Sequence, residues 1–340
     1  LKARLCIEGR RALVAYCQAK GIAHRFTGKL IVAVSDDELP RLDALWERGR
    51  ANGIEGLELL DASAIRAREP HCAGIRAIFS PVTGIVDYGE VAASFASDVR
   101  DMQGEILSGH AVTAVARSSG TVEITTSSLA IRARALITCA GLYADRLARM
   151  TGGPRDPKIV PFRGDYLVLK PERRDLIRGN IYPVPDPSFP FLGAHFTPRM
   201  DGAVWMGPNA VLAFAREGYS FGTIKPAELL ESLTYPGLVR LALKYPFVAV
   251  TEMYRDVAQN AYVEWLRRYI PELRPSDVLR GPSGVRAQAL AADGALVDDF
   301  IFEGNDNILH VRNAPSPAAT ASLAIASYIA DEADRNFTLN

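Results

Sequence analysis

The chain has 340 residues, of which 48% are hydrophobic and 23% are charged. This composition is ordinary for a globular protein, and the length suits one large domain or two modest ones. Its 39 basic and 39 acidic residues give a formal net charge of zero. Nucleic-acid binding would need a basic excess, so we expect no nucleic-acid partner. Apolar runs such as 30–34 are short beside the ~20 residues that span a bilayer.

The metal-binding and thiol residues are scattered. The four cysteines have apolar neighbours and no Cys-x-x-Cys spacing, which predicts buried free thiols of a reducing compartment rather than disulfides. None of the five histidines has another histidine four residues further on. We therefore expect no zinc site.

Helical and extended patterns alternate in the first half of the chain. Apolar spacing predicts a helix from Lys2 to Lys20 that ends on Gly21. Ser35 and Glu38 have the spacing of a capping box at the start of the next helix, and Asp61 is the expected cap of a short third helix. The remaining segments are expected as strands over 28–34, 75–79, 105–107, 112–117, 121–125 and 133–139, and as helices over 88–102 and 142–150.

A change of composition divides the chain after this point. The run 112–150 ends in an apolar strand, Ala140-Gly141 and a helix, which is typical of half a nucleotide-binding fold. Proline becomes frequent and alanine rare after Arg149, so we place a domain change near 152–157. Downstream we expect helices over 225–269 that are broken at Pro236 and Pro246, strands over 283–289, 296–302 and 308–311, and a helix from Pro317 to about Asp331.

The start of the last helix is one candidate for binding chemistry. Ser316 suits the N-cap and Pro317 the first helical position. The unpaired N–H groups of a helix start favour an anion, although a capped helix packed on a sheet is the plainer interpretation. Small residues at helical spacing predict a face that lies close to another backbone: Ala318, Ser322, Ala326 and Ala330.

Three further side chains are candidates for substrate chemistry. Arg286 and Gln288 alternate on one strand face and suit a clamp on a carboxylate, or a surface ion pair. Arg163 is a second candidate carboxylate ligand, or a partner of Asp165 or another acid. His195 lies between apolar residues, where it is either structural or a base that takes a hydroxyl proton.

Four segments together resemble one known family. Gly284-Val285-Arg286-Ala287-Gln288, 193–198, 140–145 and Asn313 to Thr320 resemble the FAD-dependent L-2-hydroxyglutarate dehydrogenase/oxidase family, a branch of the D-amino-acid-oxidase-like flavoproteins. Members of that family begin with a glycine fingerprint for the FAD pyrophosphate, whereas this sequence has no two glycines two residues apart. The resemblance implies that an N-terminal βαβ unit precedes Leu1 in the family.

The resemblance also implies roles for the candidates. His195 would take the hydroxyl proton of the substrate while a hydride passes to the flavin. Groups that bind a dicarboxylic 2-hydroxy acid would be Arg286, Arg163, Gln288 and Asn313. Groups that contact FAD would be Val112 beside the adenine, Ala140 and Gly141 near the pyrophosphate, and Asn313, Ala314, Ser316, Pro317 and Thr320 at the flavin.

The implied fold is mixed α/β, with two domains: a Rossmann-like FAD domain that lacks its first βαβ unit and a mixed-sheet substrate domain. We assign 1–20, 87–155 and 281–340 to the first domain, and 21–86 and 156–280 to the second.

The implied reaction is oxidation of L-2-hydroxyglutarate to 2-oxoglutarate, with a quinone or oxygen as electron acceptor. An amine or amino-acid oxidase of the same superfamily and a non-catalytic fragment unable to hold FAD are the alternatives. We expect a cytoplasmic protein. Peripheral binding to the inner face of the membrane is the alternative, and in a eukaryote we expect a mitochondrial location. Residues 254–269 are either a membrane-surface face or a solvated helix.

Overall fold

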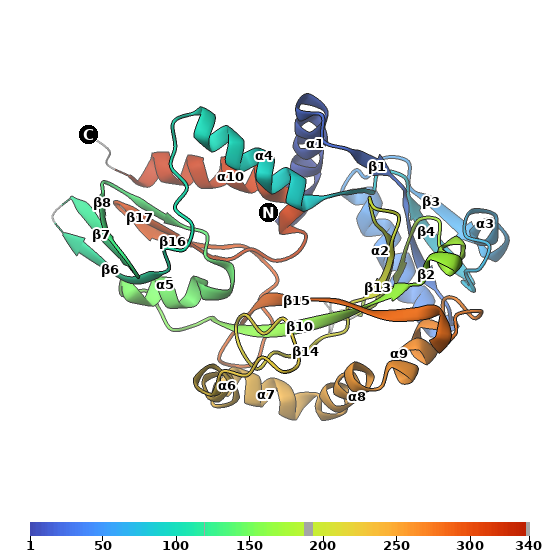
Figure 1. Ribbon diagram of the computed structural model, residues 1–340. Helices are drawn as coiled ribbons and strands as arrows, with labels where there is room; N and C mark the ends of the chain where they lie inside the picture. Colours follow the sequence, from blue (N-terminus) through green and yellow to red (C-terminus); the bar gives the residue numbers. More distant parts are fainter. Residues whose placement is uncertain (119, 187–192, 338–340) are drawn as a thin grey trace.

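Two long paired strands belong to the sheet of the larger lobe and reach toward the smaller lobe. The computed structural model describes residues 1–118, 120–186 and 193–337. In Figure 1, β10 (Lys158–Leu169) and β15 (Val278–Leu290) extend from the smaller lobe on the left to the larger lobe on the right. They are antiparallel partners from Lys158 opposite Leu290 to Leu169 opposite Val278, with one irregularity between Asp165 and Leu167. The expected mixed α/β architecture is confirmed.

A nine-stranded mixed sheet forms the larger lobe. Its order is β14-β10-β13-β12-β11-β2-β4-β3, with β15 on the other side of β10. The pair β2–β11 is parallel and the other pairs are antiparallel. The bounds of these strands are β2 (Lys29–Ala33), β3 (Glu58–Asp61), β4 (Arg76–Ser80), β11 (Asn180–Pro183), β12 (His195–Pro198), β13 (Val204–Gly207) and β14 (Val211–Leu212).

The main hydrophobic core lies on one face of this sheet. Leu30, Ile181, Phe196 and Met206 project from four neighbouring strands into this core, where they pack with side chains of α9 (Gln259–Leu266). Successive side chains of a strand point to opposite faces. The residues that alternate with this apolar set are therefore turned to the other face of the sheet.

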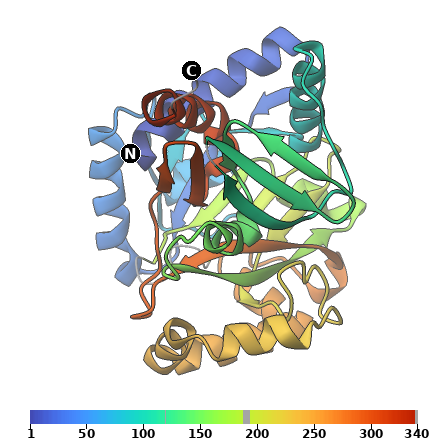
Figure 2. The same cartoon turned by 90° about the vertical axis from the view of Figure 1, so that its left-hand side faces the viewer.

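A layer of four consecutive helices covers the lower side of the molecule in Figures 1 and 2. These are α6 (Pro226–Leu233), α7 (Pro236–Lys244), α8 (Pro246–Val257) and α9. The first three each carry proline in the first turn, where its missing N–H costs nothing. The expected breaks at Pro236 and Pro246 are confirmed.

The smaller lobe contains two three-stranded sheets, which face the viewer in Figure 2. One is the antiparallel meander of β6 (Val112–Ser118), β7 (Thr121–Thr126) and β8 (Ala130–Ala133). In the other, β17 (Ile308–Asn313) pairs in parallel with β9 (Leu136–Thr138) and antiparallel with β16 (Ile301–Asn305). The expected strand over 105–107 is wrong, since these residues lie in the connection that precedes β6.

Several helix boundaries follow the local signals and one does not. Helix α1 (Lys2–Lys20) ends on Gly21, whose φ of 68° is left-handed, and Asp61 Oδ1 accepts a hydrogen bond from Ala64 N at the start of α3 (Ala62–Arg68). The capping box of Ser35 is wrong. Glu38 instead accepts a hydrogen bond from Val34 N at 2.8 Å, because a short 3-10 helix, η1 (Asp36–Glu38), precedes α2 (Leu39–Ala51).

The remaining elements connect the two lobes. Helix α4 (Tyr88–Asp101) follows the small antiparallel pair of β1 (His24–Phe26) and β5 (Gly84–Val86), and α5 (Ala144–Met150) packs under the smaller lobe.

The four cysteines are free thiols. Cys17 and Cys72 are buried as expected, whereas Cys6 is half-buried and Cys139 is exposed, which corrects the expectation for these two.

The first and last helices cross at very short range. An added Cβ at Gly9 of α1 would lie 2.5 Å from Ala321 Cα of α10 (Ala318–Asn336). The expectation of a close helix contact is confirmed, but on another face: the buried positions of α10 are Ala321, Ile325, Ile329 and Ala333, whereas Ala326 and Ala330 are exposed.

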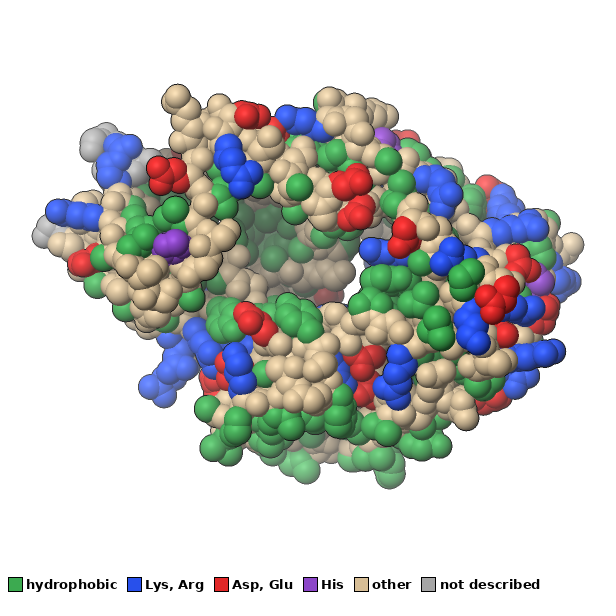
Figure 3. Space-filling model, viewed as in Figure 1, with side chains coloured by type: hydrophobic (Ala, Val, Ile, Leu, Met, Phe, Trp, Pro, Cys, Tyr) green, Lys and Arg blue, Asp and Glu red, His purple; other side chains and the backbone are tan. Residues whose placement is uncertain are grey.

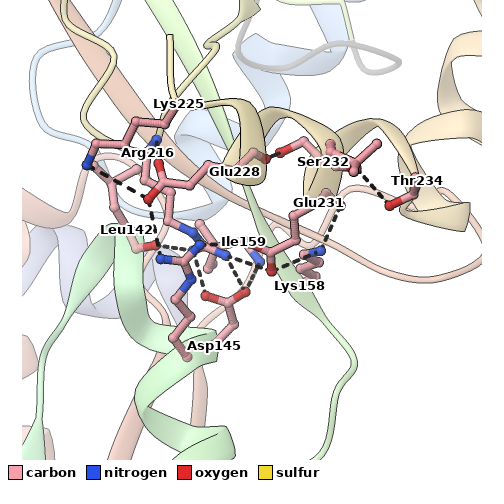
Figure 4. Close-up of polar contacts among 12 residues, drawn as sticks. Leu142, Asp145, Lys158, Ile159, Arg216, Lys225, Glu228, Glu231, Ser232 and Thr234 are labelled. Atoms are coloured by element: carbon pink, nitrogen blue, oxygen red, sulfur yellow. Dashed lines mark hydrogen bonds and ion pairs between the residues drawn. The ribbon is translucent and has the colours of Figure 1, made fainter. Parts of the chain in front are cut away.

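A buried ion cluster joins α5, β10 and α6, as Figure 4 shows. Arg216 donates to both carboxylate oxygens of Asp145, at 2.7 and 2.9 Å, and its guanidinium lies 3.6 Å from Glu231. Burial opposes the charge of Glu231, but hydrogen bonds from Arg146 and Lys158 outweigh it and lower the pKa of Glu231 to about 2. Glu231 therefore stays charged at neutral pH, and the cluster links the helical layer to α5.

The α1–α10 crossing yields a stability prediction. We expect Gly9→Ala to destabilise the protein by about 1–3 kcal/mol, because the methyl group meets backbone atoms that cannot move aside. Gly49→Ala is the control, since its Cβ would meet only Leu57 Cδ1, the end of a flexible side chain. Urea unfolding measures both, and an equal gain in stability in the two variants would refute the contact.

Candidate active site

A cavity of about 670 Å³ lies between the larger sheet, α1 and the start of α10. Figure 3 shows a deep hollow between the lobes from the side seen in Figure 1. The cavity is lined by the sheet face opposite the core, by α1 and by the residues that open α10. Of the predicted site residues, the structure brings His195, Ser316, Pro317 and Thr320 together around it.

His195 reaches the cavity because of its place in the sheet. Ile181 lies opposite Phe196 in the β11–β12 pair and both belong to the core, so the adjacent Tyr182 and His195 are turned to the other face. Their rings stack with centroids 3.7 Å apart and planes inclined by 6°. The stack fixes the imidazole plane at the cavity wall.

The surroundings of His195 keep its ring neutral. Burial, followed by the positive charges of Arg286 and Lys29, lowers the pKa of His195 to about 3. A neutral imidazole at pH 7 can accept a proton, which a structural imidazolium cannot do. The sequence alone left open whether His195 was structural or a base, and the structure places its side chain at the cavity wall.

Arg286 lies near this histidine although it comes from a distant strand. It is opposite Phe162 in the β10–β15 pair, and its charge acts on His195 and on Tyr166. Burial lowers the pKa of Arg286, and the neighbouring Tyr166 and Tyr262 oppose this shift. A guanidinium remains charged at neutral pH under such a shift.

Arg163 is committed elsewhere. Its side chain is 1% exposed, and it bonds to Asp165 at 3.0 Å and to Asp256 at 2.6 Å. Asn209 donates to the other oxygen of Asp256 and accepts from the backbone N–H of Asp165, which closes the network. Of the two interpretations given above for Arg163, the structure shows the ion pair. It faces α8 rather than the cavity.

Two further polar candidates bond to nearby backbone. The Gln288 amide donates to the carbonyl oxygen of Ala289 at 3.0 Å, so its nitrogen does not complete a clamp with Arg286. The Asn313 amide is buried and donates to the carbonyl oxygens of Val297 and Asp299. It holds the end of β17 against the segment before β16.

The opening of α10 differs in detail from the expected cap. The helix begins at Ala318 with Pro317 at the N-cap, and no side chain caps it, so the assignment of Ser316 as N-cap is wrong. The first bond within the helix joins Ala321 N to Pro317 O. The N–H groups of residues 318–320 therefore have no partner within the helix, and this positive helix end adjoins the cavity.

The other predicted cofactor contacts lie outside this cavity. Val112, at the start of β6, and Ala314 are exposed, and Gly141 is exposed with a φ of 49° at the turn after Ala140. The cavity also contains groups that the sequence analysis missed: Lys29, Tyr182, Tyr88 and Thr197. Because the strand is continuously apolar from Leu30 to Val34, no alternation marks Lys29 as a cavity residue.

The chain matches a family model for FAD dependent oxidoreductases, called DAO, over residues 1–332. The chain belongs to this FAD-dependent oxidoreductase family. It is 52% identical to the mitochondrial L-2-hydroxyglutarate dehydrogenase of Nematostella vectensis, over all of this chain and 78% of that protein. The human protein of the same name is 50% identical, with 77% of its length covered, and that of Indibacter alkaliphilus is 44% identical, with 85% covered.

Solved structures of other enzymes share the fold. L-α-glycerophosphate oxidase from Mycoplasma pneumoniae with FAD bound superimposes with a TM-score of 0.73 at 21% identity, over 96% of this chain and 77% of that one. L-proline dehydrogenase from P. horikoshii gives 0.69 at 14% identity, over 99% and 80%. The expected D-amino-acid-oxidase-like fold is thereby confirmed.

The shifted pKa of His195 predicts an acid dependence of stability. The unfolded chain binds a proton near the ordinary pKa of 6.5, whereas the folded chain does so only near 3. Stability is therefore unaffected above pH 6.5 and falls below it, by about 1.4 kcal/mol per pH unit at most. Unfolding titrations between pH 7 and 4.5 should show a shallower fall in His195→Gln than in the native protein. Parallel curves would contradict the burial of this imidazole.

Proposed function

We propose that the protein oxidises L-2-hydroxyglutarate to 2-oxoglutarate with FAD as its cofactor. Relatives that carry this activity in their names are 44% to 52% identical over almost the whole chain. The observation that carries the proposal is the neutral His195 at the cavity, with the charge of Arg286 close enough to act on it. A 2-hydroxy acid needs both groups: a cation for its carboxylate and a base for its hydroxyl.

The residues present fit the flavin end of the cofactor. The uncapped start of α10 opens onto the cavity opposite His195, and its free N–H groups suit a ring edge that gains negative charge on reduction. Ser316, Pro317 and Thr320 would line that edge, with Ala314 and Asn313 behind them. When bound, FAD supplies the acceptor for the hydride from the substrate carbon.

We extend the proposal to the rest of the cofactor. Ala140 and the left-handed Gly141 would face the pyrophosphate, because no side chain fills the space at Gly141, and Val112 would lie beside the adenine. The division into a FAD domain of 1–20, 87–155 and 281–340 and a substrate domain of 21–86 and 156–280 belongs to the same proposal. The packing of α1 on α10 supports the inclusion of 1–20.

The chain's own residues would act as follows. The Arg286 guanidinium binds the carboxylate next to the reacting carbon and so orients the hydroxyl toward His195. The free nitrogen of the imidazole accepts the hydroxyl proton as the carbon is oxidised. Burial is the largest cause of the low pKa of His195, and the charges of Arg286 and Lys29 add to it. A bound carboxylate would offset these two charges and so make the imidazole a stronger base when substrate is present.

Two variants separate the proton step from binding in the FAD-loaded protein. We expect His195→Gln to lower kcat for L-2-hydroxyglutarate by about 10²- to 10⁴-fold with little change in KM, because general-base catalysis is lost. We expect Arg286→Lys to lower kcat/KM by about 10- to 100-fold, because the planar two-point contact is lost. Steady-state kinetics measures both.

Different results would contradict the role of His195 and the role of Arg286. A His195→Gln protein with near-native kcat would remove the base and favour oxidation of an amine, which needs no base for an O–H proton. An unchanged kcat/KM in Arg286→Lys would make Arg286 structural.

We also propose that the enzyme delivers electrons to a quinone at a membrane surface, with oxygen as the alternative acceptor. The helical layer presents an exposed apolar face, seen along the lower edge of Figure 3. No helix in residues 1–118, 120–186 and 193–337 is long and apolar enough to cross a bilayer. The exposed side chains of this apolar face are Leu230, Leu233, Leu243, Phe247, Val250, Tyr254 and Val257. The face lies mainly on α6–α8 rather than on the expected 254–269.

Flotation with vesicles tests the membrane proposal. Amphipathic helices bind a bilayer interface through buried apolar area. Phe247 is 85% exposed and Leu243 is 76% exposed, so Phe247→Ser/Leu243→Ser should remove most vesicle-bound protein without changing the unfolding midpoint. Met102→Ser, at an exposed apolar residue that follows α4 and lies outside the helical layer, is the control. Equal flotation of all three proteins would exclude this face.

A further inference from the structure

Lys29 lies at the cavity end of β2 and takes no part in the proposed proton transfer. Leu30 and Val32 of this strand enter the core, so the neighbouring Lys29 points to the opposite face with Tyr182 and His195. Lys29 Nζ lies 5.1 Å from the centroid of the Tyr182 ring, on which His195 stacks. Lysine, tyrosine and histidine thus form one continuous wall of the cavity.

The amine of Lys29 is half-buried and has no carboxylate partner among the described residues. Within the described part of the chain, no hydrogen bond or ion pair joins it to an acidic group, and its amine lies over the Tyr182 ring. Burial lowers the pKa of Lys29. Burying an unpaired charge costs free energy, which a bound anion recovers. The wall of the cavity is therefore prepared for a negative group at this point.

The strand order places Lys29 and Arg286 on opposite sides of the base. From β15, which carries Arg286, the sheet runs through β10 and β13 to β12, which carries His195, and then through β11 to β2 and Lys29. Among charged groups, Arg286 and Lys29 are the two whose positive charges lower the pKa of His195. Two cations that flank one base match a substrate with a carboxylate at each end and the reacting hydroxyl near one of them.

We infer that Lys29 binds the second carboxylate of the substrate, the one remote from the reacting carbon, and thereby selects dicarboxylic over monocarboxylic 2-hydroxy acids. This inference rests on the proposed function and deepens it. It also supplies the second carboxylate ligand for which the sequence suggested Arg163, whose guanidinium is bound by Asp165 and Asp256.

Other cations at the cavity are less suited to this task. Arg11 pairs with Glu55 at 2.9 Å, and Arg199 lies over the Trp205 ring at 4.1 Å. Arg25 is exposed on β1. Arg10 projects from α1, on the other wall, and its charge is not among those that act on His195.

The test compares ligands that differ only in the remote carboxylate. Calorimetric titration of the full chain with glutarate and with pentanoate measures binding without turnover. In the FAD-loaded protein, kcat/KM is measured for L-2-hydroxyglutarate and for L-2-hydroxypentanoate. We expect Lys29→Met to weaken glutarate binding and to raise KM for L-2-hydroxyglutarate by about 10- to 100-fold, with kcat nearly unchanged and less than about 3-fold loss for the monocarboxylates.

Three more variants make the result specific. Lys29→Arg keeps the charge and should restore most of the preference for the dicarboxylate. Arg25→Met and Arg10→Met remove a cavity cation without touching the proposed carboxylate contact, and both should keep the preference. Unfolding midpoints within a few degrees of the native protein verify that each variant is folded.

The outcomes separate this inference from the proposed function. If the native protein oxidises L-2-hydroxyglutarate and Lys29→Met retains the preference for the dicarboxylate, the role of Lys29 is wrong and the function stands. If Arg10→Met loses the preference instead, the remote carboxylate binds at α1 and the inference is likewise overturned. If the native FAD-loaded protein oxidises neither acid, the proposed function itself has failed.

Discussion

The alternation of side chains across the nine-stranded sheet is the constraint on which the site depends. The core needs Leu30, Ile181 and Phe196 on one face, beside α9. Since successive residues of a strand point in opposite directions, their neighbours Lys29, Tyr182 and His195 have to reach the other face. A shift of any of these strands by one residue would place a charged or polar group in the core. Packing and chemistry are thus fixed by the same register.

A few placed cations, rather than the net charge of the protein, would attract a dianionic substrate. The sequence has a net charge of zero, so the field of the whole molecule offers little attraction for a dianion. Arg163 and Arg216 are neutralised inside the protein by Asp256 and Asp145. Arg286 and Lys29 instead act on the neutral His195 at the cavity. Selectivity for a dicarboxylate would then come from where the cations are placed rather than from how many there are.

Helix ends that depend on local signals were predicted from the sequence. Gly21, Asp61 and the prolines of the helical layer determine helix ends through their own backbone and side chains, and each was predicted. Contacts and buried faces that depend on a partner far away in the sequence were not predicted. Arg163 meets Asp256 across 93 positions of chain, and the buried face of α10 is chosen by Gly9 of α1. Lys29 was not predicted, because the residues that follow it in the strand are all apolar. No alternation therefore marks it as a position that reaches the cavity.

The central claim is that one sheet face binds a dicarboxylic 2-hydroxy acid through Arg286, His195 and Lys29. An experimental structure of the FAD-loaded protein with 2-oxoglutarate tests it most directly. The account predicts the carboxylate next to the keto carbon on the Arg286 guanidinium, the keto oxygen within hydrogen-bonding distance of the His195 ring, and the remote carboxylate on the Lys29 amine. A ligand bound away from β2, β12 and β15, or one in the reverse orientation with its keto group at Lys29, would contradict the account.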